Sequence, residues 1–126
     1  MDKKKRILIV DDDDQISRMY TTLLEIKGFA TSRVNNGEDA LAVVLEFKPD
    51  LILLDVMMPK ISGFDVADIL HNTADTKEIP IIMLSALGGK EDRERAAASG
   101  IVYYYVKTEI DTESIAKKIE EILSKN

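Results

Sequence analysis

The sequence contains no cysteine, no long hydrophobic run and less positive than negative charge. Without cysteine, the 126-residue chain has no disulfide framework, no thiol nucleophile and no cysteine-based metal site. Its apolar runs are too short to span a bilayer, and the charged start MDKKKR lacks the apolar segment of a signal peptide. These absences predict a cytoplasmic chain with no membrane partner.

The shortage of positive charge also bears on possible partners. The net charge is −6, which disfavours non-specific binding to nucleic acid, so none is expected within this chain. The basic run at residues 3–6 is short and precedes a strand, and we interpret it as a solvated leader. Length, 45% hydrophobic residues and the lack of repeats or linkers predict a single domain over residues 1–126.

Short apolar segments alternate with segments of helical period along the chain. Three of them are nearly continuous apolar runs, which is typical of parallel strands covered on both faces. FATSRV is more polar, as an edge strand would be. The expected strands cover residues 6–10, 29–34, 51–54, 80–84 and 101–106.

Helical spacing of apolar residues links these strands. The stripes cover residues 16–24, 41–45, 66–70 and 115–123. Gly28 is expected to end the first helix, Asn36 to cap the second, and Ser62 with Asp65 to form a capping box. The segment GKEDRERAAASG offers mainly alanine for packing, so this helix is expected to be weakly attached.

Five strand–helix units in succession predict an α/β fold. Right-handed crossovers place helices on both faces of a doubly wound, five-stranded parallel sheet. The flavodoxin-like strand order 2-1-3-4-5 is the natural candidate for five strands. Ligands of such sheets bind beyond the carboxyl ends of the strands, where the strand order reverses.

Polar residues stand at these strand ends. Asp11 and Asp12 follow the first strand, Asp55 follows the third, Ser85 the fourth, and Lys107 ends the fifth. Neighbouring carboxylates repel one another, and oxygen-only ligands suit a hard divalent ion, so we expect Mg²⁺. Asp55 can be a nucleophile toward a phosphoryl group, while Lys107 and Ser85 can contact its oxygens.

Asp13 and Asp14 complete the run of four aspartates but are interpreted differently. Acidic residues are favourable in the first turn of a helix. We therefore expect these two to cap the following helix or to be solvated, outside the site.

The segments VDDDDQ, LLDVMMPKISG, MLSA and YYVK resemble, in order and spacing, the response-regulator receiver domain of two-component signalling, in particular a chemotaxis-type single-domain receiver. The resemblance covers residues 6–123. It implies that a histidine kinase, or a phosphotransfer protein, phosphorylates Asp55. It also implies that Asp12 binds Mg²⁺ directly, Asp11 largely through water, and Met57 through its backbone carbonyl.

The resemblance further implies a switch. Phosphorylation would draw Ser85 toward the phosphoryl group, and Tyr104 would turn into the space that Ser85 leaves. The surface of the fourth helix, fifth strand and fifth helix would then change and bind a downstream protein, with a dimer possible on phosphorylation. Tyr104 is expected on the opposite sheet face from Tyr103 and Tyr105, because side chains alternate along a strand.

Three positions qualify the resemblance. Thr108 stands where the family usually has proline, so a cis peptide after Lys107 is not expected. Met57 and Leu87 occupy the positions two after the aspartate and two after the serine, which influence hydrolysis in the family. Neither side chain can orient an attacking water, which predicts slow self-dephosphorylation.

Three other functions fit the sequence less well. A phosphatase of the haloacid dehalogenase type would place its nucleophile after the first strand, and a flavodoxin-like flavin carrier would not place four aspartates beside a phosphate. A degenerate receiver that only binds partners would lack the full set of site residues. We therefore expect this chain to catalyse its own phosphorylation and its own slow dephosphorylation. We do not expect a conventional turnover enzyme.

Overall fold

A parallel sheet runs through the computed structural model, which describes residues 3–124. Within this range the strands are β1 (Arg6–Val10), β2 (Ala30–Val34), β3 (Leu51–Asp55), β4 (Ile81–Ser85) and β5 (Tyr103–Val106). They pair in the order β2-β1-β3-β4-β5, and every pairing is parallel. The predicted flavodoxin-like order is therefore confirmed.

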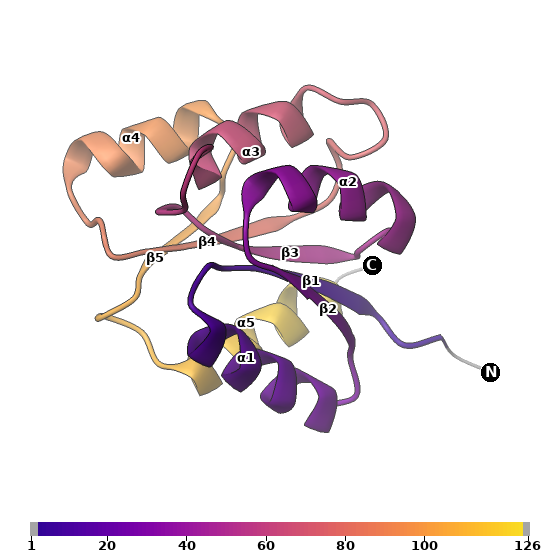
Figure 1. Ribbon diagram of the computed structural model, residues 1–126. Helices are drawn as coiled ribbons and strands as arrows, with labels where there is room; N and C mark the ends of the chain where they lie inside the picture. The colour runs from indigo at the N-terminus through magenta and orange to yellow at the C-terminus, as the bar shows by residue number, and fades with distance from the viewer. Residues whose placement is uncertain (1–2, 125–126) are drawn as a thin grey trace.

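Helices cover both faces of this sheet (Figure 1). α1 and α5 lie on one face, and α2, α3 and α4 lie on the other. Their bounds are α1 Asp14–Ile26, α2 Gly37–Phe47, α3 Gly63–His71, α4 Lys90–Ala98 and α5 Thr112–Leu123. Each crossover is a helix between two parallel strands, as the alternating pattern predicts.

Two hydrophobic cores follow from the alternation of side chains along the strands. Leu8, Ile52 and Met83 face α2, α3 and α4, while Ile7 and Ile82 face α1 and α5. All five of these side chains are buried. The edge strand β2 is more exposed than β1 and β3, as its polar sequence predicts.

The helix caps form where the sequence predicts them. Asp13 caps α1 by accepting backbone N–H bonds from the first turn, and Asn36 caps α2 in the same way. Ser62 and Asp65 form the complete capping box of α3. Asp13 therefore caps α1, which is one of the two roles predicted for Asp13 and Asp14.

The fifth strand begins later than predicted. Its sequence suggests residues 101–106, but the strand covers Tyr103–Val106. The Ile101 N–H donates to the Ala96 carbonyl at 3.0 Å and completes the end of α4, while Gly100 adopts a left-handed φ of 81°. Because Ile101 closes the helix, it cannot also join the strand.

Within residues 3–124, no helix combines the length and the hydrophobicity that a bilayer crossing requires.

Candidate functional site

The polar residues predicted from the strand ends meet at one edge of the sheet. Asp11 and Asp12 follow β1, Asp55 and Ser85 are the last residues of β3 and β4, and Lys107 follows β5. Because β1, β3, β4 and β5 are consecutive neighbours in the sheet, their carboxyl ends lie side by side. The third strand ends one residue later than predicted and the fourth is shifted by one residue, from the predicted 80–84 to Ile81–Ser85, so Asp55 and Ser85 are themselves strand residues.

Three carboxylates form a cluster at this edge. Asp11, Asp12 and Asp55 each place one oxygen so that all three lie within 4.8 Å of one another. Asp11 and Asp55 are buried, at 5% and 4% exposure, while Asp12 is exposed to solvent. Asp13 and Asp14 stay outside the cluster, since Asp13 caps α1 and Asp14 pairs with Arg18 and Arg33.

Lys107 partly compensates this concentration of negative charge. Its Nζ lies 3.3 Å from Asp11 Oδ2 and 3.3 Å from Asp55 Oδ1. One ammonium against three carboxylates leaves excess negative charge in a partly buried pocket. An all-oxygen donor set of this kind fits a hard divalent cation such as Mg²⁺.

The ionisation of the site residues reflects this environment. Burial, and secondarily the charge of Asp11, raises the pKa of Asp55 to about 6, against the opposing effects of Lys107 and the Met57 backbone N–H. Burial alone would lower the pKa of Lys107, but Asp55 and Asp11 outweigh it and raise that pKa. Lys107 is therefore held as a cation, while the Asp55 carboxylate gains from any added positive charge.

Ser85 is fully buried beside this cluster and connects two loops. Its Oγ accepts a hydrogen bond from the Leu87 N–H at 2.8 Å, and its carbonyl accepts one from the Lys107 N–H at 2.8 Å. Oγ acts as the acceptor toward Leu87, so the O–H can still donate to an anion. No cis peptide occurs among the described residues, which agrees with the expectation from Thr108.

The start of α3 packs directly on the end of β3. The Gly63 N–H donates to the Val56 carbonyl at 2.8 Å, and a Cβ on Gly63 would overlap the Asp55 carbonyl oxygen. A side chain here would therefore push α3 away from the strand that carries Asp55. The turn before it exposes Met57 at 54%, beside a hollow that Leu87 also lines.

Tyr104 contacts the loop that follows Ser85. Its hydroxyl donates to the Leu87 carbonyl at 2.6 Å, and the Arg93 guanidinium lies 5.6 Å from its ring centroid. Tyr104 packs with the core under α2–α4, whereas Tyr103 and Tyr105 pack with the core under α1 and α5. The predicted placement on opposite sheet faces is thus observed.

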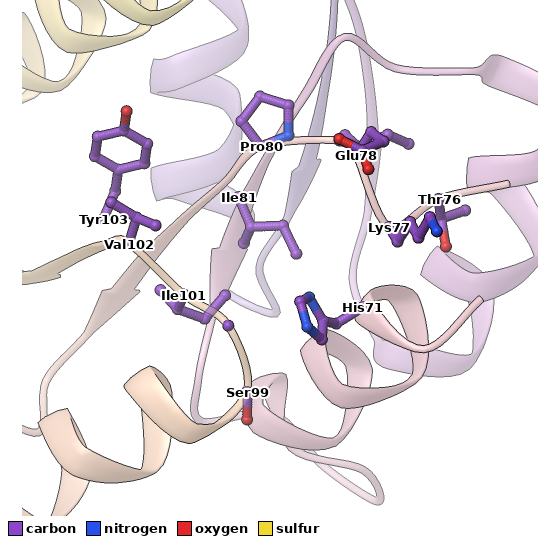
Figure 2. A pocket seen from close by; sticks show the side chains of 12 residues that line it. His71, Thr76, Lys77, Glu78, Pro80, Ile81, Ser99, Ile101, Val102 and Tyr103 are labelled. Atoms are coloured by element: carbon purple, nitrogen blue, oxygen red, sulfur yellow. The ribbon is translucent and has the colours of Figure 1, made fainter. Parts of the chain in front are cut away.

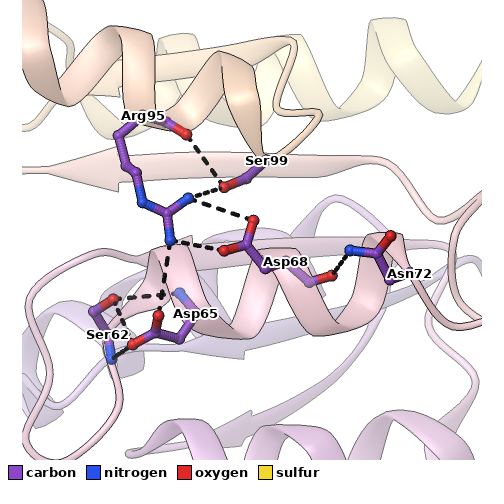
Figure 3. A network of polar contacts seen from close by, with 6 residues as sticks. All are labelled: Ser62, Asp65, Asp68, Asn72, Arg95 and Ser99. Carbon is purple, nitrogen blue, oxygen red and sulfur yellow. Dashed lines mark hydrogen bonds and ion pairs between the residues drawn. The ribbon is translucent and has the colours of Figure 1, made fainter.

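Sequence reasoning missed the polar attachment of α4. Ala96 is the one buried side chain of this helix, in keeping with its thin apolar content. Arg95, however, reaches α3 and pairs with Asp68 and Asp65 at 2.7 and 3.7 Å (Figure 3). These partners are separated from Arg95 by about thirty positions in the sequence, so no local pattern could have revealed the contact.

A second hollow lies at the other end of the strands, between the α3–β4 and α4–β5 loops (Figure 2). His71 at the end of α3 lines it and faces Ile101. The hollow holds about 180 Å³, below the ~300 Å³ at which small-molecule pockets usually begin. We assign it no chemistry.

The fold and the site define a class of protein: a flavodoxin-like α/β domain with an acidic pocket at the carboxyl edge of its sheet. The sequence profile of the response regulator receiver domain matches residues 7–120. The chain is 36% identical over 118 residues to the DNA-binding dual master transcriptional regulator RpaA of Synechocystis, covering 94% of this chain and 48% of that protein. It is 35% identical over 103 residues to the polar-differentiation response regulator DivK of Brucella anthropi, covering 82% and 84%.

The solved structures agree with these relatives. The chemotaxis response regulator CheY4 of Vibrio cholerae superposes with a TM-score of 0.86 at 27% identity, covering 95% of this chain and 99% of that one. A putative response regulator from Chloroflexus aurantiacus gives 0.88 at 29% identity, covering 98% and 100%.

This chain belongs to the response regulator receiver domain family of two-component signalling. Receiver domains generally bind Mg²⁺ at the acidic pocket and interact with histidine kinases or phosphotransfer proteins and with downstream targets. The chain spans about half the length of the transcriptional regulators that it matches, 48% in the case of RpaA.

Proposed function

We propose that this domain is a phosphorylation-activated switch that accepts a phosphoryl group on Asp55. The observation that carries the proposal is the position of Asp55: buried at the end of β3, with Asp11 and Asp12 oxygens within 4.8 Å and Lys107 at 3.3 Å. A carboxylate held in this way lies at the carboxyl edge of the sheet and is surrounded by groups that can receive the added charge.

The transfer follows from the groups at the site. An Asp55 carboxylate oxygen attacks the phosphorus of a phosphohistidine, so that an oxygen–phosphorus bond forms and the phosphorus–nitrogen bond breaks. The electron pair of the broken bond stays on the histidine nitrogen, which takes up a proton. Lys107 pairs with one phosphoryl oxygen, and the Ser85 hydroxyl donates a hydrogen bond to another.

The pocket also fits the divalent cation that the family implies. Asp11, Asp12 and Asp55 would hold Mg²⁺, with the Met57 carbonyl as a further ligand. When bound, Mg²⁺ supplies positive charge that offsets the charge of the transferring phosphoryl group. Lys107 remains as the second positive charge at the site, held there by its contacts with Asp11 and Asp55.

A hydrogen-bonded path supports the proposed switch. The Leu87 N–H donates to Ser85 Oγ, and the Leu87 carbonyl accepts from the Tyr104 hydroxyl. A movement of Ser85 toward a phosphoryl group would therefore shift the loop that holds Tyr104. The affected surface consists of α4, β5 and α5, where we propose that a downstream protein binds and where a dimer could form.

Labelling of Asp55 tests this proposal. Incubation with acetyl phosphate and Mg²⁺ should add the mass of one phosphoryl group to the wild-type chain and none to Asp55→Asn. The matched control is Asp13→Asn, which changes a neighbouring carboxylate outside the cluster and keeps a residue that can cap α1. This variant should be labelled like the wild type.

A degenerate receiver that acts only as a scaffold is the alternative. It would bind its partner equally well with and without acetyl phosphate and would take up no label. Absence of label in the folded wild type would contradict phosphorylation at Asp55 and favour the scaffold. Equal label in Asp55→Asn would also contradict it, since the phosphoryl group would then be on another residue.

A further inference from the structure

Helix α4 is attached to the domain by few apolar contacts. Ala96 is its one buried side chain among the described residues, and its N-cap Gly89 provides no side-chain cap. By contrast, α5 buries Ile115 and Ile119 together with two further side chains. The position of α4 must therefore depend strongly on its polar contacts.

Arg95 provides the densest group of these contacts (Figure 3). Its two terminal nitrogens donate to the Asp68 carboxylate, at 2.7 and 3.4 Å, which is the paired geometry that a guanidinium favours. The same side chain donates to Ser99 Oγ at 2.6 Å, pairs with Asp65 at 3.7 Å and lies 5.3 Å from the Phe64 ring centroid. We call Arg95, Asp65, Asp68 and Ser99 the α3–α4 clasp.

Asp65 connects the α3–α4 clasp to β3, the strand that carries Asp55. Asp65 closes the capping box of α3 with Ser62, so it fixes the first turn of that helix. The next contact is Gly63, whose N–H bonds the Val56 carbonyl directly after Asp55. The clasp is therefore fixed relative to the end of β3.

On α4, the α3–α4 clasp lies close to Arg93, which contacts Tyr104. Arg93, two residues before Arg95 on α4, donates from Nε to the Gly88 carbonyl at 3.4 Å and lies over the Tyr104 ring. Tyr104 in turn bonds the Leu87 carbonyl, and Leu87 bonds Ser85. If α4 moved away from α3, Arg93 and the loop of residues 86–89 would move with it.

We infer that Arg95 is a positioning residue of the switch: through Asp68 and Asp65 it holds α4 against α3 and favours the arrangement in which Tyr104 is bonded to the β4–α4 loop. The inference rests on the proposed function, since it assigns Arg95 a role in how Asp55 is coupled to Tyr104. The contacts also lower the pKa of Asp68, as expected for a carboxylate bonded to Arg95.

The solvent exposure of the Arg95–Asp68 ion pair determines how much this pair can contribute to folding stability. Arg95 and Asp68 side chains are 40% and 39% exposed, so the ion pair contributes little to global stability. Because α4 has so few buried apolar contacts, loss of the ion pair should mainly change the position of this helix. An effect of Arg95 on α4 can therefore be distinguished from unfolding of the whole domain.

The test compares Arg95→Ala and Asp68→Asn with Lys90→Ala, which removes an exposed ion pair of the same helix. Hydrogen exchange of the α4 amides should be roughly three- to ten-fold faster in the first two variants and unchanged in Lys90→Ala. Exchange in α1 and α5 should stay at wild-type rates in all three, which distinguishes the clasp from global unfolding.

Binding of beryllofluoride with Mg²⁺, a mimic of the phosphoryl group, provides the second measurement. Because Arg95 favours the arrangement that a phosphoryl group would shift, the affinity should rise by roughly three- to ten-fold in Arg95→Ala and Asp68→Asn. The exchanged pair Arg95→Asp with Asp68→Arg should bring the affinity most of the way back to the wild-type value, because the ion pair is restored in reverse. Wild-type affinity in the single variants, or no return toward it in the exchanged pair, would overturn the inference.

The measurements distinguish a failure of the proposed phosphorylation of Asp55 from a failure of the proposed role of Arg95. If the wild type does not bind beryllofluoride, phosphorylation at Asp55 is contradicted. The hydrogen-exchange rates of the α4 amides in the free protein then still test whether Arg95 holds α4 against α3. Unchanged rates in Arg95→Ala would overturn that role. If the wild type binds and the single variants bind equally well, the clasp alone is wrong.

Discussion

The ionisation of Asp55 depends on its position in the fold more than on its residue type. In an unfolded chain its carboxyl would have a pKa near 3.8, whereas burial and Asp11 raise it to about 6 in the folded protein. Between these values the folded state binds more protons than the unfolded state. Folding stability attributable to Asp55 therefore falls as the pH rises from about 4 to about 6.

The first prediction is a stability difference between the wild type and Asp55→Asn without metal. In EDTA at pH 7 the variant should be more stable by about 1–3 kcal/mol, because it lacks the buried charge. The advantage should shrink as the pH falls from about 6 to about 4, because Asp55 takes up a proton in the folded protein over this range. Urea unfolding of both proteins from pH 4 to pH 8 measures it, and a difference that does not change with pH would contradict the argument.

A second residue-scale prediction concerns the lifetime of the phosphorylated form. Met57 and Leu87 present apolar side chains near the acceptor, and neither can bind an attacking water. The phosphorylated protein should therefore persist for minutes or longer, measured by loss of label after removal of acetyl phosphate. Met57→Asn should shorten this lifetime about ten-fold, with Met57→Leu as control. A wild-type lifetime of a few seconds would count against the prediction.

At the scale of elements, the helices differ in how firmly they are packed. α5 buries Ile115, Ala116, Ile119 and Leu123 against the sheet, whereas α4 buries Ala96. Elements with few buried contacts open locally at lower free energy than the whole molecule. The helix with the fewest buried side chains is therefore the one that follows the loop carrying Leu87.

The third prediction follows from this contrast. Native-state hydrogen exchange of α4 amides should be roughly ten- to a hundred-fold faster than that of α5 amides. In α5, Ile119→Ala should cost about 2–5 kcal/mol of global stability, because it removes a fully buried side chain. Equal protection of the two helices would show that the polar contacts of α4 are as effective as a hydrophobic stripe.

Most elements could be located, though not always to the exact residue, because their signals are local. Asn36, Ser62 and Asp65 act within one helical turn, and the apolar runs of the strands are read directly from the sequence. The early start predicted for β5 was wrong. Ile101 is apolar enough for a strand, but its N–H is used by the end of α4, and only the folded chain shows that competition.

At the scale of the whole molecule, the acidic edge links cation binding to folding. Asp11, Asp12 and Asp55 come from two strand ends that are far apart in the sequence and meet only in the folded state. A cation that binds this cluster therefore binds the folded protein and not the unfolded chain. Mass action then converts its binding into stability.

The fourth prediction uses this linkage. Mg²⁺ at about 100 times its dissociation constant should stabilise the wild type by about 2.7 kcal/mol, and EDTA should remove the gain. Asp12→Asn should lose most of it, while Asp13→Asn should keep it, because the Asp13 carboxylate lies outside the cluster and caps α1. Thermal unfolding measures all three. Similar losses in both variants would show that the cation binds the aspartate run unspecifically.

The sequence by itself determined the parallel α/β architecture and the identity of the polar residues at the strand ends, which follow from periodicity, caps and the positions of the charged residues. The strand order 2-1-3-4-5 was the natural candidate by analogy with flavodoxin-like sheets, and the structure confirms it. The tertiary structure alone decided that Lys107 lies 3.3 Å from both Asp11 and Asp55, and that Arg95 ties α4 to α3. The reason is physical: these contacts join residues distant in the chain, and their geometry depends on how whole elements pack.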